Sequence, residues 1–181
     1  MPARTRTAII EAAISVFAAN PGASLGDVAK AAQVGRATLH RHFSCRDALL
    51  REVSLDAIRA CDEAVADLNV DELRGHDLLQ AVLEAVIPLG DRYYYLSAVG
   101  LEGDPEVAAA YANQTERLHS LVVRLKEEGV FDPLVPDRWI STAFDALIWA
   151  GWHAVGTGDV ARNDAASRVA RTLTQGLAPT Q

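Results

Sequence analysis

Apolar residues recur at intervals of three and four positions along almost every segment of this chain, and alternating runs of Val, Ile and Thr are absent. That spacing is typical of amphipathic helices, whereas β-strands place apolar residues at every second position. The pattern therefore predicts an all-α fold of about nine helices, in which a three-helix N-terminal helix-turn-helix domain precedes a larger C-terminal helical bundle.

The N-terminal pattern predicts a first helix over residues 4–20, which Asn20-Pro21-Gly22 ends. Ser24 is placed to cap a second helix, with Asp27 three residues later. A third helix covers 36–42, and a long fourth helix follows to about residue 68. We expect the helix-turn-helix at about 24–43, a DNA-binding domain over 1–47, and a ligand-binding and dimerisation domain over 48–181.

Further helices are expected in the second domain near residues 77–89, 91–101, 105–128, 136–156 and 163–177. Pro88 should end or kink the first of these, because proline removes a helical hydrogen bond. Gly129 should end the 105–128 helix through a left-handed cap.

The overall charge of -7 conceals an asymmetry along the chain. Residues 1–60 carry eight Lys and Arg against five acidic residues, which gives +3, and the remaining residues carry nine against nineteen, which gives -10. A small basic module on an acidic body suits a protein in which only one end meets phosphate. Ordinary variation in surface charge is the alternative interpretation.

The second and third helices have the geometry that fits the major groove of B-DNA. Val34, Leu39 and Phe43 are apolar where the third helix must dock, which leaves its basic and polar residues exposed. At this point the stretch AQVGRATLHRHFSCRDAL, residues 32–49, closely resembles the helix-turn-helix of the TetR (tetracycline repressor) family. The resemblance covers residues 4–60, about a third of the chain, and it implies operator DNA as a partner.

The resemblance also implies which residues contact DNA. It places four residues of the third helix near base edges, two histidines where the family has tyrosines that touch phosphate, and Arg46 where a lysine grips the backbone. With Ser24 at the cap of the second helix and Arg4 in the first, the candidates are Arg4, Ser24, Arg36, Ala37, Thr38, His40, Arg41, His42 and Arg46. Gln33 replaces the usual turn glycine, so a left-handed backbone there would cost about 1 kcal/mol.

The 136–156 helix is apolar on two sides and therefore needs two neighbours. One is its own core, and the other is either a second subunit or, in a monomer, more of the same chain. In the TetR family the last two long helices form a four-helix dimer bundle, which implies a homodimer and a pseudo-palindromic operator. The candidate interface residues are Trp149, Trp152, Val169, Leu173 and Leu177.

A pocket for a small-molecule effector is implied by the resemblance alone, inside the C-terminal body. The candidate lining residues combine apolar bulk with a polar group, as ligand pockets do, and they are Tyr94, Tyr95, Tyr111, Gln114, Leu118, Phe144 and Trp149. Gln114 is the leading polar candidate because its neighbours on the same helix face are apolar.

The sequence offers little support for an enzyme: no nucleophile with a nearby base, no glycine-rich phosphate loop and no metal-spaced cluster occurs. We expect no cofactor and no metal. No apolar run reaches the ~20 residues of a membrane span, and we expect a cytoplasmic protein. The sequence thus favours a ligand-responsive repressor, with a TetR-like activator or an interaction module without DNA binding as alternatives.

Overall fold

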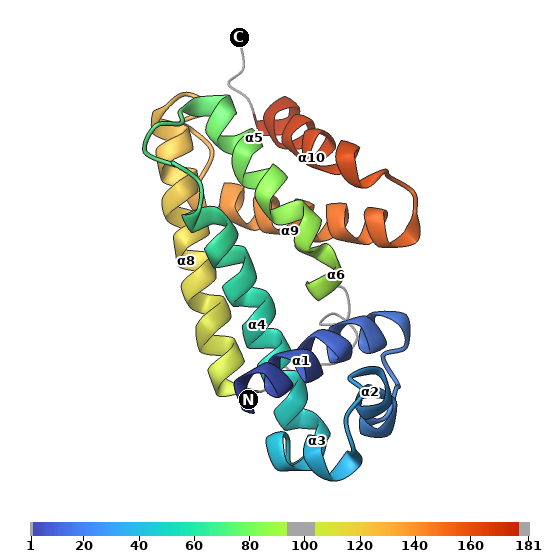
Figure 1. Cartoon of the computed structure of the whole chain (residues 1–181). Helices are drawn as coiled ribbons and strands as arrows, with labels where there is room; N and C mark the ends of the chain where they lie inside the picture. The colour runs from blue at the N-terminus through green and yellow to red at the C-terminus, as the bar shows by residue number, and fades with distance from the viewer. Residues whose placement is uncertain (1, 94–103, 178–181) are drawn as a thin grey trace. The chain divides into compact units, whose positions relative to one another are not determined.

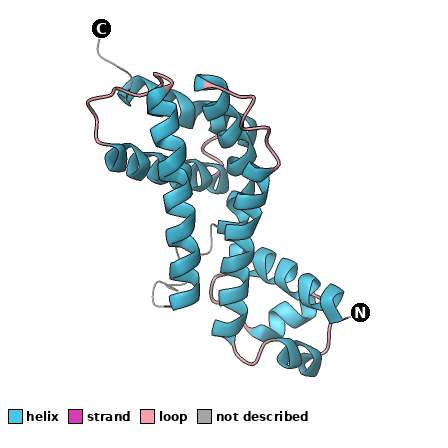
Figure 2. Ribbon diagram, turned by 90° about the vertical axis from the view of Figure 1, so that its left-hand side faces the viewer, coloured by secondary structure: helices cyan, strands magenta, loops and turns pink. Residues whose placement is uncertain are grey.

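The structure is a computed structural model that describes residues 2–93 and 104–177, and all regular structure in these ranges is helical (Figure 2). The first four helices are α1 (Pro2–Ala19), α2 (Leu25–Ala31), α3 (Arg36–His42) and α4 (Arg46–Ala66). They are followed by α5 (Gly75–Val86), the 3-10 helix η1 (Ile87–Leu89), α6 (Gly90–Tyr93), α8 (Pro105–Glu127), α9 (Asp137–Thr157) and α10 (Arg162–Leu177). The prediction of an all-α chain is confirmed.

The helix ends expected at proline and glycine are also found. Pro88 lies in η1, directly after α5 ends. Gly129 has a φ of +79°, and its N–H and that of Val130 donate to the carbonyls of Lys126 and Leu125, as in a left-handed C-cap. The helix expected at 91–101 is described only as far as Tyr93, and its remainder lies outside the described residues.

Contacts divide the chain into two compact units, and the division falls inside α4, between Ala57 and Ile58. The first unit contains residues 1–57 together with the described parts of 91–110, and the second contains 58–90 and 111 onward. Helix α4 therefore belongs to both units, whereas the sequence analysis places the domain boundary near its first turn.

The N-terminal unit has a core built from α1, α2, α3 and the first half of α4. Its largest fully buried side chains are Phe17, Ile9, Leu39 and Leu49. Since α2 and α3 have seven residues each, they are too short to be stable alone. Packing against α1 and α4 therefore holds them in place.

In the C-terminal unit, α5, α9 and α10 pack together, as the green, orange and red helices of Figure 1 show. Gly151 lets α9 pack closely against η1 and α10, because a Cβ there would lie 3.0 Å from Ile87 Cδ1 and 3.1 Å from Val169 Cγ2. Apolar residues from all three helices form the buried core, among them Leu78, Leu79, Leu83, Ile140, Phe144, Trp152, Val169 and Leu173.

Candidate nucleic-acid interface

Helix α2 begins with a capping box formed by Ser24 and Asp27. The N–H of Asp27 donates to Ser24 Oγ (3.2 Å), and the N–H of Ser24 donates to Asp27 Oδ2 (2.8 Å). The Ser24 hydroxyl also donates to this carboxylate (2.7 Å), and these bonds, the hydroxyl first, hold the pKa of Asp27 below its usual value. The cap predicted from the sequence is confirmed, and it fixes the residue at which α2 starts.

The turn between α2 and α3 passes through Gln33, whose φ is +55°. The N–H of Gln33 donates to Lys30 O (3.2 Å) and that of Val34 to Ala29 O (2.9 Å), which is the bond pattern of a Schellman cap. Glycine adopts this backbone readily, whereas a side chain there costs about 1 kcal/mol. The turn thus keeps its geometry despite a residue that disfavours it.

Helix α3 has one buried side and one exposed side. Leu39 is fully buried and Phe43, directly after the helix, is 2% exposed, so these two side chains dock α3 onto the core. Six of the predicted contact residues lie on the side of the helix opposite Leu39 or at the edges of that side. Arg36, Ala37, His40 and Arg41 are exposed there, and Thr38 and His42 are half-buried.

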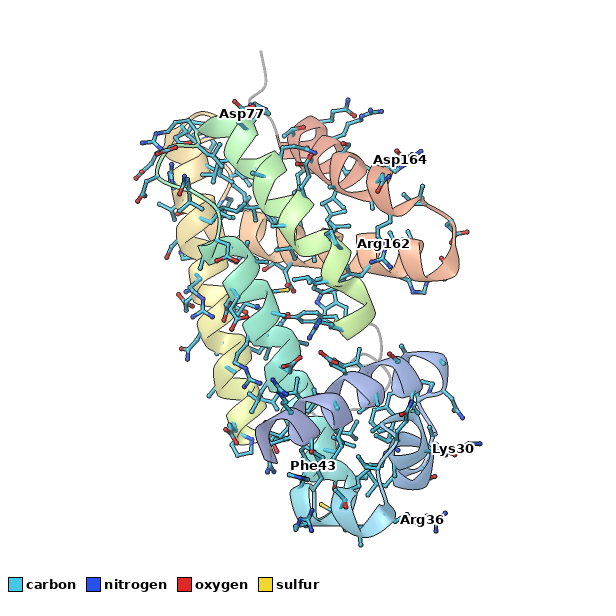
Figure 3. All side chains as sticks on the ribbon, viewed as in Figure 1. Lys30, Arg36, Phe43, Asp77, Arg162 and Asp164 are labelled. Carbon is cyan, nitrogen blue, oxygen red and sulfur yellow. The ribbon has the colours of Figure 1, made fainter. Side chains whose placement is uncertain are left out.

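A hollow of about 330 Å³ lies between α2 and α3 and opens to solvent. Its lining residues are Ser24, Leu25, Gly26, Arg36, Leu39 and His40. The Arg36 side chain lies over Gly26, because a Cβ at position 26 would be 3.1 Å from Arg36 Nη2. In Figure 3 the labelled side chains of Lys30 and Arg36 extend away from the ribbon on one side of this unit.

No salt bridge neutralises the cations of this face in the described part of the chain, although the charges of Lys30 and Arg36 add to the Ser24 bonds in lowering the pKa of Asp27. Lys30, Arg36 and Arg41 each form no ion pair there. An unpaired, hydrated cation can exchange its water and counterions for phosphate without first breaking an internal bond. The face therefore combines positive charge with small and polar side chains, and the core of the N-terminal unit holds α3 in place beneath it.

Arg46, at the start of α4, has internal partners instead. Its guanidinium donates to the carbonyl oxygens of Ala23 and Pro21, and Cζ lies 4.6 Å from the centre of the Phe17 ring. These contacts join α4 to the segment between α1 and α2. Arg46 thus positions the helix-turn-helix, and a phosphate contact through it stays a prediction.

Helix α1 supplies two further basic residues. Arg4 is exposed, as a contact to DNA requires. Arg6, which the sequence analysis did not single out, pairs with Glu52 of α4 (2.5 Å), and its Cζ lies 5.3 Å from the centre of the Phe43 ring. The arginine over Phe43 packs the end of α3 against α1 and α4.

The N-terminal unit matches a known family. The model of the bacterial regulatory proteins of the tetR family matches residues 9–53. Over 178 residues the chain is 33% identical to the HTH-type transcriptional repressor LfrR of Mycolicibacterium smegmatis, covering 96% of this chain and 90% of LfrR. The chain belongs to the TetR family. It is therefore a DNA-binding transcriptional regulator and not an enzyme.

Solved structures of TetR-like regulators extend the match to the whole fold. The crystal structure of LfrR from Mycobacterium smegmatis in complex with proflavine has a TM-score of 0.80 and 30% identity, and the alignment covers 98% of this chain and 99% of LfrR. A TetR-family regulator from Rhodococcus sp. has a TM-score of 0.79 at 17% identity, over 96% of this chain and 98% of the other, which shows the shared fold.

The residues predicted for the effector pocket of this TetR-family chain are partly brought together. Tyr111 of α8 accepts a hydrogen bond from the Trp149 side chain of α9. Phe144 is fully buried in the core, and Leu118 is half-buried. The Gln114 amide faces α4, where it donates to Ile58 O and Asp62 Oδ1 (both 3.4 Å). Tyr94 and Tyr95 lie outside the described residues.

An acidic residue that was not predicted from the sequence lies beside Tyr111 and Trp149. Asp145 of α9 is half-buried and accepts a hydrogen bond from the Tyr111 hydroxyl (2.9 Å). Burial raises the pKa of Asp145, and it also raises the pKa of Tyr111 to about 12. Asp145 stands one position from the apolar stripe of α9, and an acidic residue there could have been noticed in the sequence.

The predicted dimer residues are mostly buried within the single chain. Trp152 and Val169 are 5% exposed and Leu173 is fully buried, so their side chains face the chain's own core. Trp149 is half-buried, and α10 ends at Leu177. The exposed side of α9 carries other residues, among them Trp139, Thr142, Ala146, Ala150 and His153.

Among the described residues, no group of three or more His, Cys, Asp or Glu side chains could hold a metal ion. No helix in the same ranges has the length and apolar character to cross a membrane.

Proposed function

We propose that this chain is a cytoplasmic, homodimeric repressor that binds a pseudo-palindromic operator and releases it when a small molecule binds. The observation that carries the proposal is the exposed side of α3, with Arg36 and Arg41 unpaired among the described residues and Leu39 buried beneath them. Arginine can form two hydrogen bonds to guanine, and its charge also attracts phosphate.

The contacts fall into two groups. Arg36, Ala37, Thr38 and Arg41 would meet base edges, since they lie on the first turns and outer side of α3. The remaining candidates would contact phosphate, and they are Arg4, Ser24, His40, His42 and Arg46. Ser24 and Arg46 already have internal bonds, so we assign them chiefly to positioning α2 and α4.

The dimer would form through the exposed side of α9 with α10. Ala146 and Ala150 are exposed one turn apart on α9, and small side chains let a second helix approach closely. Trp149, half-buried beside them, would be covered further by a second subunit. Two copies related by two-fold symmetry would present two α3 helices to the half-sites of an inverted repeat.

The effector would act on the C-terminal unit and reach DNA binding through α4. This helix is continuous from Arg46, which holds the helix-turn-helix, to Ala66 in the other unit. LfrR has been crystallised with proflavine, a planar aromatic molecule, and we propose an effector of the same size class here. Thermodynamic linkage then requires operator and effector to weaken each other's binding by the same factor.

The test is fluorescence anisotropy of the purified full-length protein on DNA that flanks its own gene, with random DNA of equal length as the control. We expect tighter binding to the flanking DNA and a steep loss of affinity as salt rises, because bound cations are released from phosphate. Equal, salt-insensitive binding to both DNAs would favour an interaction module and contradict the proposal.

A further inference from the structure

A tyrosine bonded to a carboxylate and to a tryptophan lies in the C-terminal unit. Asp145 and Trp149 lie one turn apart on α9, and Tyr111 of α8 hydrogen-bonds to both side chains. The Trp149 ring meets Trp152 edge-on, with ring centres 5.2 Å apart and planes at 82°. Tyr111 is 36% exposed, so the cluster can be reached by a solute. We call Tyr111, Asp145 and Trp149 the acidic aromatic cluster.

The carboxylate of this cluster differs from three others that lie on α8 or α9 or directly after α8. Glu116, Glu128 and Asp137 each form an ion pair with an arginine or a lysine. Asp145 forms none among residues 2–93 and 104–177, and its bonded partner is the neutral hydroxyl of Tyr111. A half-buried carboxylate without a cation is unfavourable in the folded state, because burial removes water and no opposite charge replaces it.

We propose that the acidic aromatic cluster binds a planar aromatic organic cation, with Asp145 as its counter-charge and the rings of Trp149 and Tyr111 as its stacking surface. The inference rests on the proposed function, since this cation would be the effector. A positive ligand supplies the charge that Asp145 lacks, and aromatic rings attract cations through their negative faces. A neutral ligand would leave the carboxylate uncompensated, and an anionic one would be repelled.

A metal ion fits the cluster poorly. Mg²⁺ and Ca²⁺ require about six oxygen ligands, whereas the described residues of the cluster offer one carboxylate and one tyrosine hydroxyl. Indole rings are poor ligands for such hard cations but good surfaces for a flat ring system. The same residues therefore select a large, weakly hydrated cation.

The experiment titrates proflavine, a cation at neutral pH, into the full-length protein and follows its fluorescence. Acridone, a neutral planar tricyclic molecule, is the comparison ligand. Asp145→Asn should weaken proflavine binding by about tenfold or more and leave acridone binding unchanged, since the change removes charge but keeps shape. The matched control is Glu116→Gln, which removes one acidic charge from α8 outside the cluster and should bind both ligands as wild type does.

A stability measurement separates loss of a ligand contact from loss of the fold. The raised pKa of Asp145 means that the folded state disfavours its charged form at neutral pH. Asp145→Asn should therefore unfold at the same temperature as wild type or higher at pH 7, and the difference should vanish at acid pH, where both side chains are neutral. A lower unfolding temperature at pH 7 would make Asp145 a structural residue and overturn the proposal.

The outcomes also separate this inference from the proposed function. Wild-type proflavine affinity in Asp145→Asn, an equal loss in Glu116→Gln, or no binding to the wild-type protein would each overturn the cation site, even if operator DNA still binds. If proflavine binds through Asp145 but the same preparation binds no operator, the site stands and the repressor function fails.

Discussion

The basic residues of α3 and those of α8 and α9 differ in what they contact. In the N-terminal unit, Arg36 and Arg41 extend from α3 without an ion pair in the described ranges. In the C-terminal unit, every Lys and Arg of α8 and α9 has an acidic partner, in the pairs Arg117–Asp62, Arg124–Glu128, Lys126–Asp137 and Arg138–Glu116. The capacity of each unit to bind phosphate therefore depends less on its number of cations than on how many of them already have an acidic partner.

This difference has an energetic meaning. A surface ion pair contributes about 0–1 kcal/mol to folding, but it must be broken before either partner can meet another charge. The cations of α3 carry no such cost and keep their counterions until phosphate releases them.

Arg46, at the start of α4, differs from the cations of α3, because its guanidinium is held inside the unit by Ala23 O, Pro21 O and the Phe17 ring. Arg46→Ala should lower the free energy of unfolding by about 3 kcal/mol, from two charged hydrogen bonds and a cation–π contact. Urea unfolding followed by circular dichroism measures the change. Lys30→Ala, an exposed control, should leave stability unchanged; an equally stable Arg46→Ala would refute the positioning role.

Arg41 and Arg117 allow a direct comparison of an arginine without an ion pair in the described ranges and one with an ion pair, each from a different unit. Arg41→Ala should weaken operator binding by about 2 kcal/mol, roughly 30-fold, and reduce the preference for operator over random DNA. Arg117→Ala removes the same charge from a pair with Asp62 and should leave the affinity unchanged. Anisotropy titrations at one salt concentration compare them, and equal losses would show that only total charge matters.

The capping box of α2 sets the position of α3, and its loss should have a moderate effect. Ser24→Ala should cost about 1 kcal/mol of stability because it leaves helix N–H groups without an acceptor. The folded state lowers the pKa of Asp27, so its contribution is present above the usual carboxyl pKa and is lost as pH falls through the folded value. Asp27→Asn should therefore flatten the acid side of the stability profile, and an unchanged profile would contradict this role.

The smallest effect concerns one left-handed helix cap from each unit, Gln33 in the N-terminal unit and Gly129 in the C-terminal unit. Gln33→Gly should raise the free energy of unfolding by about 0.5 kcal/mol, because relief of the strained backbone exceeds the added flexibility of the unfolded chain. Gly129→Ala should have the opposite sign. Thermal unfolding of both variants gives the comparison, and two changes of the same sign would contradict it.

The N-terminal unit was largely predictable from the sequence because its signals are local. The Ser24–Asp27 cap, the apolar Leu39 and Phe43, and the basic residues between them lie within one short stretch. Each signal depends on a few neighbouring residues, and all of them agree. What this stretch did not reveal is the internal role of Arg46, whose partners lie 23 and 25 positions away.

The C-terminal unit was less predictable because its contacts join distant helices. The sequence pattern around the apolar residues Trp152, Val169 and Leu173 is the same whether their neighbour belongs to the same chain or to another. The structure buries these residues in their own subunit. Asp145 was missed for the same reason, since its significance depends on Tyr111, 34 positions earlier. Helical periodicity gives the apolar sides of a helix but not the identity of what covers them.

Gly90 makes the shape of the acidic aromatic cluster depend on a residue outside it. A Cβ at position 90 would lie 2.4 Å from Trp152 Cδ1 and 2.8 Å from Cγ, although the backbone φ of -54° suits any residue. One added methyl group must therefore displace the indole that meets Trp149. Mutants selected for an altered range of inducing compounds are thus expected to include changes at position 90, although this residue is not part of the cluster.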